Sequence, residues 1–196
     1  MTTTPIKVGV VDRKPEPDYR RLISEVISRR NDPRSNAWTS AVRTALTSAT
    51  EMNALGYTER YLADLSPRQR TGGRRAAAIC ASNAGAPPAS GDFYLPIGRS
   101  LRNLYKALNG ADPSILDSGG HVSNNAMLMQ VNSLPLLDVE QAANVFGLLI
   151  GRCADKGIAV NYYDLAATLI FWGTGATPQS QRTRSAVLTA FYTPTR

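Results

Sequence analysis

The sequence predicts an all-α protein of about eight or nine helices in two small packed bundles. Three observations predict it. Apolar residues recur at helical spacing along most of the 196 residues, helix-start and helix-stop residues bracket these segments, and no segment alternates apolar and polar residues as a strand would. The hydrophobic share of 43% is typical of a folded protein with a real core.

The first half of the chain is predicted to form four helices after a mobile tail at residues 1–17, which is rich in Thr, Pro and charge. Asp18 and Ser66 are suited to cap helices because their side-chain oxygens accept free backbone N–H groups. Pro67 at the first helical position strengthens the start after Ser66. Gly56 is expected to separate the second helix from the third. The predicted helices span 18–30, 35–50, 58–65 and 66–82.

A loop at residues 84–95, rich in Pro, Gly and Ser, is predicted to separate an N-terminal bundle (18–83) from a C-terminal bundle (96–196). In the second bundle Asn161 is expected to cap a helix, with Asp164 at the capping-box position. The predicted helices span 96–109, 121–133, 139–156, 162–172 and 179–192.

The segment 96–109 sorts into two opposite faces when it is placed on a helix. The apolar face needs a core, and no carboxylate within the segment neutralises the cations opposite. We therefore expect a helix that is buried on one side and presents a positive ridge outward, although a merely solvated charged face is the alternative. The apolar stripe comprises Ile97, Leu101, Leu104 and Leu108, and the ridge comprises Arg99, Arg102 and Lys106.

The charge balance permits an anionic partner. Lys and Arg number 22 against 15 Asp and Glu, a formal net charge of +7, and most of the cations are Arg, which suits bidentate contacts to phosphate. No apolar run reaches the roughly 18 residues of a membrane span, and the start shows no signal-peptide pattern, so we expect a cytoplasmic protein with no membrane partner.

Catalytic patterns are not found. His121 is expected in a surface turn, and Cys80 and Cys153 are expected to be buried free thiols. No metal-ligand spacing, phosphate-cradling loop or nucleophile with a base partner occurs, so the sequence predicts no enzyme, no metal site and no cofactor.

Five stretches, taken in order, resemble the CasB family, the small subunit of the type I-E CRISPR-associated surveillance complex Cascade. Each is short, but their order, their spacing and the basic charge together are specific, and the resemblance runs from about Tyr19 to Tyr192. Departures include Ala159 and Asn161, where the family favours Pro and Asp. The stretches are DPRSNAWTSAVRTAL (32–46), PRQRTGGRRAAAICASNAG (67–85), IGRSLRNLY (97–105), GIAVNYYDLAATLIFW (157–172) and RSAVLTAFY (184–192).

The resemblance implies a non-catalytic, all-helical subunit of a ribonucleoprotein that acts in antiviral defence. Its partners would be guide RNA, target and non-target DNA, other Cascade subunits and a second copy of itself. Its arginines would hold the displaced non-target strand, because a few phosphate contacts can tip a nearly balanced strand exchange. Lys106, from the predicted ridge on segment 96–109, is also expected to bind nucleic acid. The basic patch carried over is Arg43, Arg68, Arg99, Arg102, Arg152, Arg182 and Arg184.

Departures from the family pattern remove charge from the last helices, so the surface could instead be shifted to residues 68–75 and the tail. Structural roles also remain open for three arginines. Arg43 could lie along the core, Arg152 could complement a helix C-terminus, and Arg184 could pair with a packing neighbour. Two other functions remain open: a basic helical adaptor that binds protein, and a sequence-tolerant DNA-binding regulator.

Overall fold

The structure is a computed structural model that describes residues 18–89 and 95–194. Within these residues the chain forms nine α-helices and three short 3-10 helices, and the only β-type pairings are two isolated bridges, so the all-α prediction is confirmed. The tail predicted at residues 1–17 lies outside the described part of the chain.

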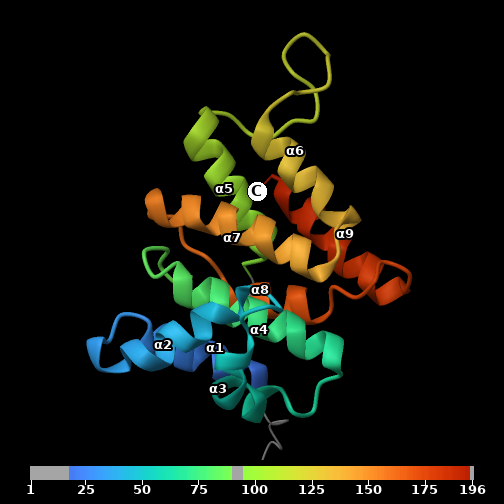
Figure 1. The fold of residues 1–196 in the computed structure, drawn as a ribbon. Coiled ribbons are helices and arrows are strands. Elements are labelled where there is room, and N and C mark those ends of the chain that lie inside the picture. The colour runs from blue at the N-terminus through green and yellow to red at the C-terminus, as the bar shows by residue number, and fades with distance from the viewer. Residues whose placement is uncertain (1–17, 90–94, 195–196) are drawn as a thin grey trace, which may run out of the picture.

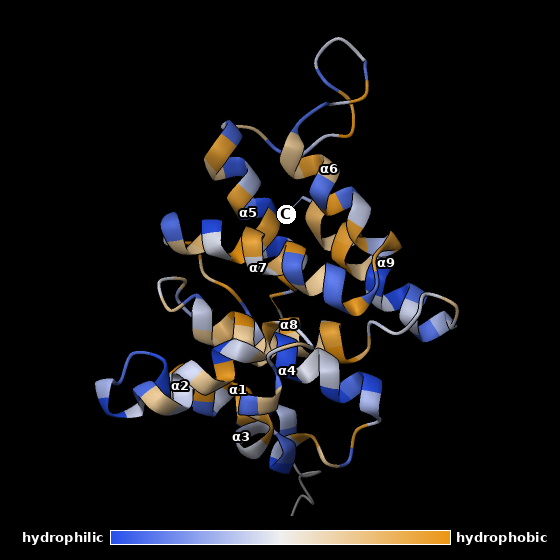
Figure 2. Ribbon diagram, in the orientation of Figure 1, coloured by the Kyte–Doolittle hydropathy of each residue, from blue (hydrophilic) through white to orange (hydrophobic). Residues whose placement is uncertain are grey.

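Four helices form the lower part of the molecule in Figure 1. The long α4 lies above α1, α2 and α3 in this view, and it contacts all three. Its first turns are hydrophilic and its last turns are mostly apolar, as Figure 2 shows. These helices are α1 (Asp18–Arg29), α2 (Asn36–Arg43), α3 (Met52–Leu62) and α4 (Pro67–Ser82), with 3-10 turns η1 (Pro33–Ser35) and η2 (Thr44–Leu46) around α2.

The other helices lie above this layer, except α8, which packs directly on α4 (Figure 1). The α5 helix packs along α9, and α7 contacts both α4 and α5. These helices are α5 (Ile97–Asn109), α6 (Ala126–Ser133), α7 (Val139–Asp155), α8 (Tyr162–Ile170) and α9 (Pro178–Tyr192), with a 3-10 turn η3 (Leu134–Leu136) after α6.

The helix start expected at Asn161 is confirmed, whereas the helix predicted over 121–133 begins only at Ala126, where Asn125 caps it. Asp164 does not complete a capping box for α8, because its carboxylate accepts the N–H of Ile97 instead. Asn161 caps α8 by accepting the N–H groups of Tyr163 and Asp164. The start of the third helix was predicted wrongly. Gly56 lies inside α3 and does not precede it, because the cost of one glycine within a helix, about 0.5–1 kcal/mol, is small beside the burial of Ala54, Thr58 and Leu62 on the same helix.

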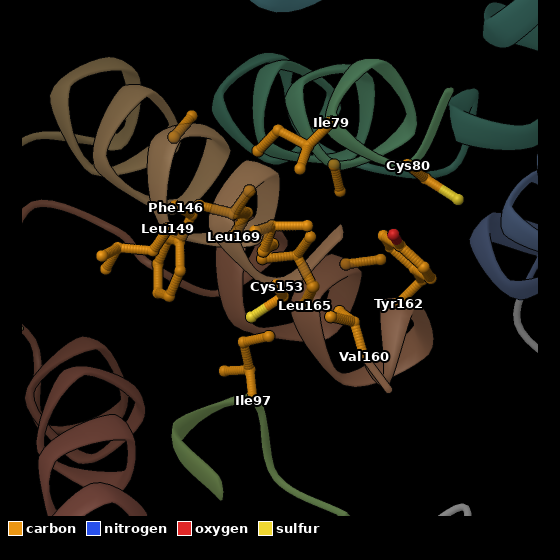
Figure 3. Packing of buried hydrophobic residues seen from close by; sticks show 14 of the residues in the cluster. Ile79, Cys80, Ile97, Phe146, Leu149, Cys153, Val160, Tyr162, Leu165 and Leu169 are labelled. Atoms are coloured by element: carbon orange, nitrogen blue, oxygen red, sulfur yellow. The ribbon is translucent and has the colours of Figure 1, made fainter. Parts of the chain in front are cut away.

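One hydrophobic cluster runs through both layers. Side chains from α4, α5, α7 and α8 meet at its centre, as Figure 3 shows for Ile79, Ile97, Phe146 and Leu165. Both layers of helices share this cluster. Side chains of α8 therefore belong to the same core as those of α4 and those of α7. The division into two bundles at residues 84–95 stays a prediction.

The two cysteines are buried free thiols, as predicted. Burial raises the pKa of Cys80 to about 12, although the nearby Arg30 guanidinium opposes the shift. Burial also raises the pKa of Cys153 to about 12. Both thiols therefore stay protonated, and they act as small apolar core residues.

Two glycines allow helices to meet backbone to backbone. A Cβ atom on Gly72 of α4 would lie 2.2 Å from the carbonyl oxygen of Leu169 in α8. A Cβ atom on Gly98 of α5 would lie 2.2 Å from the carbonyl oxygen of Val187 in α9. The positions of α8 and α9 therefore depend on these two residues lacking a side chain.

Candidate nucleic-acid interface

The apolar stripe of α5 is buried as predicted at Ile97, Leu101 and Leu104, whereas Leu108 is 42% exposed. Lys106 is exposed and Arg99 is half-buried, both on the side opposite the stripe. The stripe therefore fixes the orientation of α5 and leaves Lys106 exposed and Arg99 partly exposed.

The outward orientation predicted for Arg102 is wrong. Arg102 is 2% exposed because α9 covers that side of α5. Nη1 donates a hydrogen bond of 3.1 Å to the carbonyl oxygen of Phe191, and Nη2 lies 2.7 Å from Oδ1 of Asp112. Arg102 therefore holds α9 against α5 and does not face a ligand.

Asp112 also neutralises part of the ridge. Gly110 ends α5 in the left-handed conformation, with φ of 69°, and the chain turns so that Asp112 returns to the helix. Its Oδ1 lies 3.1 Å from Nζ of Lys106. The hydrogen bond from Lys106 and the charge of Arg102 lower the pKa of Asp112. The positive ridge expected on α5 is thus narrower than its sequence suggests.

Arg184 is also buried, at 6% exposure, so the surface role expected for it is wrong. Its guanidinium donates to the carbonyl oxygens of Trp172, Pro135 and Gly173 at 3.1, 2.7 and 2.9 Å. It also lies 5.1 Å from the centroid of the Trp172 ring. Arg184 therefore has a structural role, which was the alternative left open for it. Its partners are backbone carbonyl groups and not the ion-pair partner that was expected.

The arginines near the start of α4 do not form a substitute surface. Arg70 is half-buried and Arg74 and Arg75 are buried, and each makes an ion pair with a carboxylate. Arg75 is fully buried and binds Ser48 as well. Buried charges need such partners because desolvation without them is costly. The carboxylates are Glu51 from the residue before α3, Glu59 from α3 and Glu140 from α7.

The structure brings Arg99 and Arg182 together at one groove between α5 and α9, with a volume of about 520 Å³. Arg182 is exposed in the first half of α9. Ser185 and Thr189 follow Arg182 at helical spacing and supply hydroxyl groups. None of the lining residues is a carboxylate. The groove, which we name the α5–α9 groove, is lined by Pro96, Arg99, Arg182, Ser185, Ala186, Thr189, Ala190 and Thr193.

A second groove, of about 440 Å³, lies between α4 and α7, and neither Arg43 nor Arg152 is among its lining residues. Arg43 donates from Nε to the carbonyl oxygen of Ala81, beside the groove residue Ser82, at 3.0 Å. Arg152 is exposed one turn after the groove residue Leu148. The structure therefore does not bring these two arginines together at this groove.

Arg68 lines a third cavity, of about 690 Å³, where the first turns of α4, α7 and α9 meet the end of α8. It is exposed in the first turn of α4. Asp138 also lines the cavity, but its carboxylate accepts the N–H of Gln141 at 2.8 Å as the cap of α7. Two cations line this cavity, and of these Arg68 is exposed whereas Arg184 is buried.

Sequence reasoning missed the hydroxyl groups of the α5–α9 groove. Ser185, Thr189 and Thr193 follow Arg182 at intervals that place them on one face of α9, and this polar stripe was available from helical spacing alone. Nothing in the sequence shows that α5 packs beside this stripe.

The fold is shared with small helical CRISPR-associated proteins. One solved structure is a Cse2-family CRISPR-associated protein from Thermus thermophilus, with a TM-score of 0.62 and 15% identity, covering 90% of this chain and 99% of that one. Another is CasB from Thermobifida fusca, with a TM-score of 0.58 and 16% identity, covering 89% and 96%. No family model and no curated protein matches the chain. The CasB resemblance expected from the motifs thus has a counterpart in the fold.

The described residues contain no group of three or more His, Cys, Asp or Glu side chains that could hold a metal ion. His121 is exposed in a turn, as predicted, and its backbone N–H donates to Asp117. No helix in the described part of the chain has both the length and the apolarity needed to cross a membrane.

Proposed function

We propose that this protein is a non-catalytic structural subunit of an RNA-guided DNA-targeting complex of the Cascade type, acting in cytoplasmic antiviral defence. It binds nucleic acid through accessible arginines and keeps the displaced non-target strand apart from its complement. Its partners are guide RNA, the DNA strands, other subunits and a second copy of itself. The observation that carries the proposal is the α5–α9 groove, which Arg99 and Arg182 line and whose described lining residues include no carboxylate, on a fold shared with Cse2-family and CasB structures.

The chemistry of the groove suits a phosphate backbone. Arg guanidinium groups and Ser or Thr hydroxyl groups are common donors to phosphate oxygens, and such contacts carry no sequence information. Arg68, Arg43, Arg152 and Lys106 supply further positive charge at separate places. Several weak contacts of this kind add up when a larger assembly aligns them along one strand.

The test compares two double variants with equal charge change. Arg99→Gln with Arg182→Gln alters the α5–α9 groove. Arg21→Gln with Arg60→Gln removes two cations that already pair with Asp18 and Glu25 of α1. We expect the groove variant to lose retention of single-stranded DNA at low salt, while the control variant keeps it and both keep the wild-type circular dichroism spectrum.

Equal retention by the two variants would contradict the site. A marked preference for one duplex sequence would favour the DNA-binding regulator, and binding of a protein partner without nucleic acid would favour the adaptor. Purification of the tagged chain from its host distinguishes these functions further, since the proposal expects repeat-derived guide RNA and several other subunits to be recovered with it.

A further inference from the structure

Three cavities adjoin one another around the first half of α9. The α5–α9 groove shares Pro96 and Ala186 with a neighbouring cavity between α8 and α9. That cavity in turn shares Phe171 with the cavity that Arg68 lines. The lining residues of α9 follow the same order around the helix, from Arg182 through Thr183 to Ser180, so the three cavities lie one after another around α9, and we name them together the track.

Phe171 lies at the junction of two of these cavities. It directly follows α8, where its N–H donates to the carbonyl oxygen of Ala167 at 3.0 Å. Its side chain is half-buried, and it belongs neither to the hydrophobic core nor to the residues packed against it. An aromatic ring in this position contributes less to the core than Trp172, the fully buried residue beside it.

We infer that Phe171 is a stacking platform for an unpaired base of a single-stranded nucleic acid. The strand follows the track, with phosphates at Arg99 and Arg182 on one side of Phe171 and at Arg68 on the other. This inference rests on the proposed function and adds to it a base contact that does not depend on sequence. Every base has a flat π-face, so an aromatic side chain between cationic sites holds single strands and discriminates against paired ones.

The two carboxylates along the track do not oppose this path. Asp164 lines the middle cavity, but its Oδ2 accepts the backbone N–H of Ile97 at 2.7 Å. Asp138 caps α7. Both charges are thus directed at helix N-termini, where the partial positive charge of the backbone offsets them.

The experiment measures binding of the full chain to a labelled oligothymidine and to an abasic oligomer of equal length and charge. We expect the wild-type protein to bind oligothymidine at least about fivefold more tightly. Phe171→Leu, which keeps an apolar side chain but lacks the π-face, should abolish this preference and leave the salt dependence unchanged. Phe171→Trp should retain the preference.

Arg99→Gln with Arg182→Gln should weaken binding of both ligands alike and reduce the salt slope by about 1.4. A wild-type protein that binds both oligomers equally, or a preference that survives Phe171→Leu, would overturn the stacking role while leaving the proposed function intact. Failure to bind either oligomer at low salt would instead overturn the proposed function. Repeating the comparison with oligouridine shows whether the track accepts DNA alone or both kinds of strand.

Discussion

Asp164 of α8 accepts a hydrogen bond of 2.7 Å at Oδ2 from the backbone N–H of Ile97, the first residue of α5. One side chain therefore supports the first turn of the helix that carries Arg99. Burial raises the pKa of Asp164, and the hydrogen bond from Ile97 partly opposes this shift. The cap joins two helices that are far apart in sequence, and it does so next to the proposed track.

Asp164→Ala should destabilise the protein by about 0.5–2 kcal/mol, because the first turn of α5 loses a side-chain acceptor. Urea unfolding followed by circular dichroism measures the change. Asp164→Asn keeps an oxygen acceptor and should lose less. Equal stability of the wild-type and Ala proteins would mean that the hydrogen bond is not formed in solution.

The raised pKa of Asp164 has a consequence for acid stability. A carboxyl group that holds its proton more tightly in the folded state stabilises the fold below its ordinary pKa, and this contribution is lost as pH rises through the folded pKa. Asp164→Asn removes the titration. The stability of the wild-type protein relative to the Asn variant should therefore decline as pH rises above the ordinary range for Asp. A difference that does not vary with pH would contradict the raised pKa of Asp164.

Gly98→Ala should destabilise the protein by about 1–3 kcal/mol, because the new methyl group meets the backbone of α9. Gly56→Ala is the matched control. It also lies within a helix, but nothing lies within 4 Å of the added Cβ atom, so this variant should gain about 0.5–1 kcal/mol. Thermal unfolding of both variants gives the comparison, and a stable Gly98→Ala protein would show that α5 and α9 can separate without cost.

Arg102→Met should cost about 1–3 kcal/mol, because the buried carbonyl oxygen of Phe191 loses its side-chain donor. Lys106→Met, on the same helix and beside the same Asp112, should change stability by no more than about 0.5 kcal/mol because Lys106 is exposed. Chemical unfolding distinguishes the two. Similar small effects would indicate that Arg102 is exposed to solvent, as its sequence position suggests.

Glu140→Gln should weaken the contact of α7 with the segment after α2. Hydrogen bonds from Ser48 and then from Arg75 lower the pKa of Glu140, so its contribution is present above the ordinary Glu pKa and is lost as pH falls through the folded pKa. The side chain is partly exposed, so we expect an effect below about 1 kcal/mol. The difference between wild-type and variant unfolding should disappear in acid.

The sequence predicted most helices because their caps and apolar stripes are local features. Arg102 was mispredicted for a non-local reason. Periodicity identifies one buried face of α5, but Gly98 and Tyr105 contact α9 on a second face, and Arg102 lies on that side. The sequence of one helix does not reveal that neighbouring helices cover two of its faces.

The same limit applies to the candidate site. Arg184 is close in sequence to Arg182, yet one is buried against carbonyl groups and the other is exposed at the groove. Both residues are arginines, so composition and net charge do not show which of them is exposed. They differ in position on α9, where Arg184 shares the buried face of Val187 and Phe191, and in the carbonyl groups of Pro135, Trp172 and Gly173 that receive the Arg184 guanidinium.

The close approaches at Gly72 and Gly98 have a consequence for how distant relatives can be recognised. Both glycines lie in stretches that carry the CasB resemblance, 67–85 and 97–105, and at both any side chain would meet a carbonyl oxygen of the neighbouring helix. A chain that keeps this arrangement has little freedom at these two positions. Exposed arginines can move to a nearby position and still contact a phosphate, so the information that identifies such a chain is concentrated in its glycines rather than in its charges.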